Sequence, residues 1–227
     1  MDRDLREAKR SGNRVDLLRS RLRVGEVSQQ QVELAARLGH LAALELFSDL
    51  EPVDLADEDS GGEALAGAGE VLRNDTLHAR LALESARRVL RVWEVEFVND
   101  MRPREALAAV HAWLECPCVQ HTLEAGAAGN QLGHVFRTDE EEHMLINDPD
   151  RFRLVSAAGQ AACSAAIAAR TVGAETGAGV VTGIRSAWSA LDHAATAAGE
   201  DSDSERAWQR LRLASYALGE VGELPNE

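Results

Sequence analysis

The chain has 227 residues, and its 38 acidic residues outnumber its 24 basic residues, which gives a formal net charge of −14. This excess of negative charge argues against general nucleic-acid binding and against docking on an anionic membrane surface. Three cysteines, an odd number, argue against a closed disulfide framework. The N-terminus lacks the apolar segment of a secretory signal and no long apolar run follows, so a cytoplasmic protein is expected.

The first part of the chain, residues 1–48, predicts a small helical unit. Apolar residues recur at helical spacing before Gly25, which is expected to end that helix in a left-handed conformation. Ser28 and Gln31 have the spacing of a capping box and open a second helix, which Gly39 ends before a short third helix. This spacing resembles one unit of an α-solenoid repeat.

An acidic segment, residues 49–70, follows the helical unit. Between Phe47 and Glu70 the sequence holds eight acidic residues and no basic one, together with Pro52 and several glycines. Such a composition is typical of a solvated linker. The alternative interpretation is an acidic docking arm.

The remainder, residues 71–220, predicts an Ala-rich helical bundle without any alternating strand pattern, so the fold class is all-α. Asp75 or Thr76 is expected to cap the first helix, and Ser202 with Glu205 forms a second capping box. The predicted helices cover about residues 77–97, 103–116, 118–136, 139–145, 150–172, 180–198 and 202–218. The small residues between 157 and 198 favour either an internal seam or a self-association face.

A polar turn around residues 99–107 is the most distinctive part of the sequence. Arg102 and Arg104 have Asp100 and Glu94 close in sequence, so one interpretation is a local network of capping bonds and ion pairs. The other interpretation is a surface that binds a partner, with Asp100, Arg102, Arg104 and Trp113 as its residues.

A CPC sequence precedes His121, so that Cys116, Cys118 and His121 form a CxCxxH pattern. Thiolate and imidazole are ligands that zinc and iron accept. The two cysteines are closer than in most structural zinc sites, and a fourth ligand would have to be His134 or His143. Cysteines that pack as small apolar side chains are the alternative. The leading hypothesis therefore assigns no metal and no cofactor, and a metal site at Cys116, Cys118 and His121 is the second hypothesis.

The string VLRVWE followed by NDMRPREALAAVHAWL resembles immunity proteins of bacterial polymorphic toxin systems, which have a D-x-RPR-x-A turn between two helices. The later stretch AAGQAACSAAIAARTVGAETGAG is similar to their second half, so the resemblance covers about residues 77–199. The CPC sequence and the N-terminal unit depart from that pattern. The resemblance implies an all-helical fold and the binding of a protein partner, and it implies no site residues.

Catalytic signatures such as GxSxG, and phosphate-binding loops, are absent from the sequence, so no enzyme is expected. The leading functional hypothesis is a non-catalytic, immunity-like protein that sequesters a protein partner, such as a basic toxin, by occlusion. Its acidic surface would steer that partner. The alternatives are a metal- or thiol-dependent sensor or enzyme that uses the cysteine–histidine pattern, and a structural adaptor that assembles into homo-oligomers. Neither nucleic acid nor a membrane is an expected partner.

Overall fold

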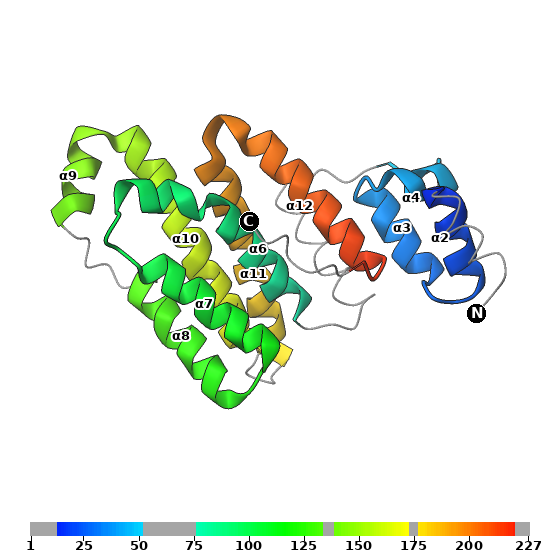
Figure 1. Ribbon diagram of the computed structural model, residues 1–227, viewed down its shortest axis with the longest axis horizontal. Helices are drawn as coiled ribbons and strands as arrows, with labels where there is room; N and C mark the ends of the chain where they lie inside the picture. The colour runs from blue at the N-terminus through cyan, green and yellow to red at the C-terminus, as the bar shows by residue number, and fades with distance from the viewer. Residues whose placement is uncertain (1–12, 52–75, 134–138, 173–176, 221–227) are drawn as a thin grey trace. The chain divides into compact units, whose positions relative to one another are not determined.

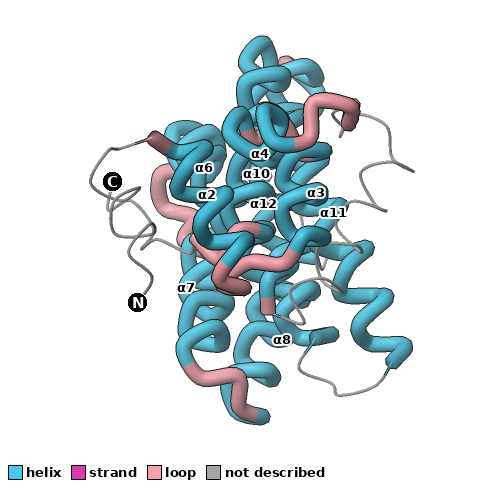
Figure 2. The backbone as a smooth tube through the Cα atoms, turned by 90° about the vertical axis from the view of Figure 1, so that its right-hand side faces the viewer, coloured by secondary structure: helices cyan, strands magenta, loops and turns pink. Residues whose placement is uncertain are grey.

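The computed structural model describes residues 13–51, 76–133, 139–172 and 177–220. Within these ranges every regular element is a helix and no strand occurs, as Figure 2 shows. The prediction of an all-α fold is therefore confirmed. The predicted acidic linker, residues 49–70, lies mostly outside the described residues, as does His134.

The chain divides into two compact units. Of the described residues, one unit contains residues 13–51 and 210–220, and the other contains residues 76–209. Helix α12 (Ser202–Ala217) contributes its first part to the second unit and its last part to the first. Each unit is described by itself below.

The first unit contains three short helices, whose ends follow the sequence signals. They are α2 (Arg14–Arg23), α3 (Gln29–Arg37) and α4 (Leu41–Leu46). The side chains of Ser28 and Gln31 make the reciprocal bonds of a capping box at the start of α3, as predicted. Gly25 and Gly39 have φ values of 74° and 85°, where a side chain would be strained, so each ends a helix as predicted.

The end of α12 is fastened to this unit by Arg21. The Arg21 guanidinium donates a 2.6 Å hydrogen bond to the Leu218 carbonyl and pairs with Glu220 at 3.3 Å. Leu213 and Tyr216 of α12 are fully buried. Val32 of α3 and Leu38, the residue that follows α3, are also fully buried. The C-terminal helix therefore supplies apolar surface that three short helices lack.

The second unit is a bundle built around one central helix. Its elements are α6 (Leu77–Glu96), α7 (Arg102–Glu115), α8 (Val119–Gly133), α9 (Asp139–Asn147), α10 (Pro149–Val172), α11 (Gly177–Ala198), the 3₁₀ turn η1 (Gly199–Asp201) and the start of α12. Helix α10 packs against α6, α7, α8, α9 and α11, and Figure 1 shows α7 and α8 running beside each other. The turn between α7 and α8 therefore joins two helices that both pack against α10.

Small side chains fill the seam around α10. Its alanines from Ala157 to Ala169 are buried, as are Ala187, Ala190 and Ala194 of α11. Small residues let helix axes approach closely, and their burial within the unit confirms the predicted internal seam.

Helix α10 is also the one helix among the described residues that is long and apolar enough to cross a membrane. Its most apolar window has a mean hydropathy of 1.2, and 67% of that window is buried inside the protein. This burial is what the central helix of a globular bundle requires.

Two predicted caps differ in the structure. Thr76 precedes α6, but its side chain makes no capping hydrogen bond, and the other predicted cap, Asp75, lies outside the described residues. Ser202 is the first residue of α12, and Glu205 reaches another helix, where it accepts a 2.6 Å hydrogen bond from Arg88. The Glu205 carboxylate, which the predicted capping box would use, thus forms an ion pair between α12 and α6.

Substitution of Gly159 by alanine is expected to destabilise the bundle. A β carbon at this position would lie 2.6 Å from Cζ3 of Trp93, which is buried on α6. Overpacking of this kind costs about 1–3 kcal/mol, which exceeds the gain of roughly 1 kcal/mol from replacing a helical glycine. Urea unfolding measures the difference. A Trp93→Phe background should reduce the loss, and an equal loss in both backgrounds would contradict this packing.

Candidate metal centre

A tight turn joins α7 to α8 and carries both cysteines. Its closing bond is donated by the Cys118 N–H to the Cys116 carbonyl at 2.7 Å, two residues back in the chain. Pro117 lies in the middle, and its ring fixes φ near −65°, close to the value of about −75° in an inverse γ-turn. The proline therefore holds the two cysteines on one short turn.

A chain of hydrogen bonds ties this turn to the core. Both the backbone N–H and the hydroxyl of Thr122 donate to the Cys118 carbonyl at 3.0 Å. The indole N–H of Trp113 donates to the Thr122 hydroxyl at 3.1 Å. Trp113 is only 1% exposed, so the position of the turn is set by a fixed core side chain.

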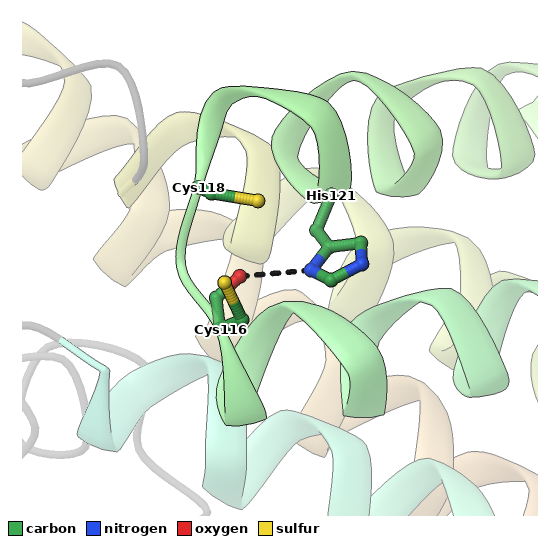
Figure 3. Close-up of side chains that lie close together, drawn as sticks. All are labelled: Cys116, Cys118 and His121. Carbon is green, nitrogen blue, oxygen red and sulfur yellow. Dashed lines mark hydrogen bonds between the residues drawn. The ribbon is translucent and has the colours of Figure 1, made fainter.

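Cys116, Cys118 and His121 bring their side chains together at this turn (Figure 3). The three candidate ligand atoms lie within 4.8 Å of one another. In a tetrahedral zinc site, with Zn–S near 2.3 Å and Zn–N near 2.0 Å, ligand atoms are roughly 3.5–3.8 Å apart. A movement of about 1 Å closes the difference, and partly exposed side chains can make it by small changes in their torsion angles.

The imidazole of His121 is oriented by the turn itself. Its Nδ1 lies 2.9 Å from the Cys116 carbonyl oxygen, and Figure 3 shows that this nitrogen is on the side of the ring that faces the cysteines. The hydrogen bond to this carbonyl raises the pKa of His121. A metal ion bound at Nδ1 would have to replace the proton at that nitrogen, so metal binding and protonation would compete there.

The two thiols differ in acidity because the backbone at the start of α8 lowers the pKa of Cys118. The backbone N–H of His121, at the start of α8, lowers the pKa of Cys118, and the neighbouring Cys116 thiol lowers it further. The proximity of Cys118 raises the pKa of Cys116. Cys118 is therefore the first of the pair to become a thiolate, the form that binds a metal.

The cluster contains no fourth donor among the described residues. His143, one of the two histidines predicted as a fourth ligand, lines a separate cavity of about 680 Å³. The second, His134, lies outside the described residues. Three protein ligands and one open position are typical of zinc sites that exchange a ligand, whereas closed structural sites have four.

The polar turn before α7 is a network of internal ion pairs. Arg102 donates to Asp100 at 2.9 Å and to Glu141 of α9 at 3.0 Å, and Arg104 donates to Glu94 at 2.8 Å. Burial favours a higher pKa for Asp100, but the hydrogen bonds from Arg102 outweigh it and lower the pKa. The pairings with Asp100 and Glu94 confirm the local-network interpretation, and the contribution of Glu141 has no signal in the sequence.

The four residues predicted to bind a partner differ in their exposure. Trp113 is buried: its indole packs in the core and positions Thr122, so a role in partner binding stays a prediction. Arg102 and Asp100 are 25% and 15% exposed and engage each other. Arg104 is the most accessible of the four.

Removal of Arg102 is expected to destabilise the second unit far more than removal of Arg104. Arg102→Gln leaves two largely buried carboxylates without their cation, at a cost of about 2–3 kcal/mol. Arg104→Gln breaks an exposed pair and should cost less than about 1 kcal/mol. Urea unfolding at pH 7 compares the two variants, and equal losses would contradict the assigned roles.

Asp100 predicts a pH dependence of stability. Because the pKa of Asp100 is lowered on folding, Asp100 contributes stability above its ordinary pKa of 3.8 and loses it as the pH falls through the lowered value. In Arg102→Gln the burial remains and raises that pKa, so the difference in stability between variant and wild type should shrink as the pH falls from 7 towards 4. A constant difference would argue against the ion pair.

A shallow cavity lies where the end of α6 meets α9 and the start of α10. Its lining residues are Glu96, Phe97, Val98, Asn99, His143, Met144, Asn147, Asp148 and Arg151. Arg151 pairs with Glu96 across it, a contact between residues 55 positions apart. Its lining comes from residues 96–99 and 143–151, which only tertiary packing brings together, so no sequence motif marks it.

The chain matches no protein-family model, no curated protein and no solved structure.

Proposed function

We propose that the protein binds a zinc ion through Cys116, Cys118 and His121. The observation that carries this proposal is the convergence of two thiols and one imidazole within 4.8 Å on a turn that a proline closes. The donor set of two sulfurs and one nitrogen suits a thiophilic d¹⁰ ion such as Zn²⁺, and oxygen-preferring ions such as Mg²⁺ do not match it.

Bound zinc would cross-link the end of α7 to the first turn of α8. Cys116 is exposed and the other two ligands are half-buried, so the ion has direct access from solvent. Easy access together with three protein ligands favours a site that gains and loses its metal or its fourth ligand, as a sensor or a regulated binding protein requires.

Metal analysis of untagged protein tests this proposal. The protein is reduced, incubated with excess Zn²⁺, freed of unbound metal by gel filtration and analysed by mass spectrometry of the elements. We expect about one zinc ion per chain to be retained. Retention of less than a tenth of this amount would overturn the proposal.

A second candidate function is the immunity-like sequestering of a basic protein partner in the bacterial cytoplasm. Exposed apolar side chains favour it: Val95, Val98 and Met101 are exposed around the α6–α7 turn, and Ile146 is exposed on α9. The net charge of −14 and the resemblance in the RPR turn support the same hypothesis. Co-purification with a toxin encoded beside its gene is the expected result, and failure to bind any such toxin would count against it.

A further inference from the structure

The proposed metal centre has one coordination position for a ligand from outside the chain. Zinc prefers four ligands, and the described residues offer three at this turn. Cys116, at one edge of the cluster, is exposed. A donor from solvent could therefore reach a metal held at this turn.

Two exposed apolar side chains stand beside the cluster on α8. Val119 is 77% exposed and Leu123 is 65% exposed. They are four residues apart, so they form a single patch on one face of the helix, directly after Cys118. Exposed apolar side chains grouped in this way provide the anchoring contacts of protein interfaces.

The surface around the patch carries acidic side chains. Glu115 and Glu124 are exposed on either side of the turn, and no lysine or arginine occurs between Glu105 and Phe136. The basic side chain of Arg170 on α10 lies against α8 at Gly126, on the C-terminal side of the patch. A second copy of this chain, with its net charge of −14, would be repelled. A basic partner would be attracted.

We infer that a basic protein partner donates a cysteine thiolate to the zinc ion held by Cys116, Cys118 and His121, with apolar contacts on Val119 and Leu123. This inference rests on the proposed zinc site. In the step, the partner thiol releases its proton to solvent, a zinc–sulfur bond forms, and the water on the fourth position leaves. The product has three thiolates and one imidazole around zinc, a donor set that zinc holds well.

Three synthetic peptides with blocked ends test the inference on the full-length, zinc-loaded protein. The peptide RLCLR carries the thiol, the apolar side chains and the positive charge. RLSLR lacks the thiol, and ELCLE reverses the charge. Binding is measured by isothermal titration calorimetry in a reducing buffer, with zinc-free protein as the reference.

We expect RLCLR to bind the zinc-loaded protein at least about 10-fold more tightly than either control peptide, and to bind zinc-free protein more weakly by a similar factor. The double variant Val119→Ser, Leu123→Ser should retain zinc yet lose most of the affinity for RLCLR. Leu41→Ser, which changes an exposed apolar side chain on α4 of the first unit, should bind as wild type does.

The outcomes separate this inference from the function on which it rests. If the protein retains zinc but binds all three peptides equally, or if the double variant binds RLCLR as tightly as wild type, the inferred partner site is wrong and the zinc site stands. If the protein retains no zinc, both are overturned.

Discussion

Replacement of Trp113 by alanine is expected to lower the free energy of unfolding by about 3–5 kcal/mol, the largest loss expected here from one side chain. Trp113 is 1% exposed and belongs to the core formed by α6, α7, α8, α10 and α11. The truncation leaves a large void and also removes the donor that holds Thr122. Urea unfolding of the second unit, followed by circular dichroism at 222 nm, measures the change.

Two milder variants separate packing from hydrogen bonding at this position. Trp113→Phe keeps an aromatic ring and loses the indole N–H, so it should cost about 1–2 kcal/mol. Thr122→Val keeps the side-chain shape and leaves the indole N–H without its acceptor, at about 1–3 kcal/mol. A loss below about 1 kcal/mol in Trp113→Ala would show that the indole does not fill the core.

The second large effect is on zinc affinity. Cys116→Ser, Cys118→Ser and His121→Ala each remove one of three ligands, so each should weaken zinc binding by more than the roughly 10–100-fold that loss of an outer-shell partner costs. Competition with a chromophoric zinc chelator gives the dissociation constants. All three positions are at least partly exposed, so the variants should remain folded.

Cys163 is the matched control for these variants. Its thiol is buried on α10 and donates to the Gly129 carbonyl at 3.3 Å, and burial raises its pKa. Cys163→Ser should therefore bind zinc as tightly as wild type does. If Cys163→Ser weakened zinc binding as much as Cys118→Ser, the assigned ligands would be wrong.

The fold follows from local signals in the sequence to a large extent. Several local features depend only on residues within one or two helical turns. They are the Ser28–Gln31 capping box, the helix ends at Gly25 and Gly39, and the position of Pro103 in the first turn of α7. Such signals can be read from the sequence because the interacting groups are neighbours in the chain.

Contacts between residues that are far apart in the chain cannot be predicted from such local signals. Glu205 has the spacing of a capping residue, yet it pairs with Arg88, 117 positions away. Glu141 joins Arg102 only because α9 folds back towards the start of α7. The burial of Trp113 likewise depends on which face of α7 meets α8 and α10. Tertiary packing decides each of these cases.

The candidate metal centre could be predicted from the sequence in part. The residue types and the CxCxxH spacing are evident in the sequence, but the short spacing of the cysteines argued against zinc. The turn closed by Pro117 explains how this spacing brings the sulfurs and the imidazole together. The position of His121 in the first turn of α8 completes the arrangement.

The most direct test of the zinc site is a titration of the reduced, metal-free protein with Co²⁺, followed by its absorption spectrum. The account predicts an end point at about one equivalent, with a near-ultraviolet thiolate-to-cobalt band and visible bands of tetrahedral intensity, all displaced by Zn²⁺. The Cys116→Ser, Cys118→Ser double variant should show neither band. A weak octahedral spectrum without a thiolate band in the wild-type protein would contradict the zinc site.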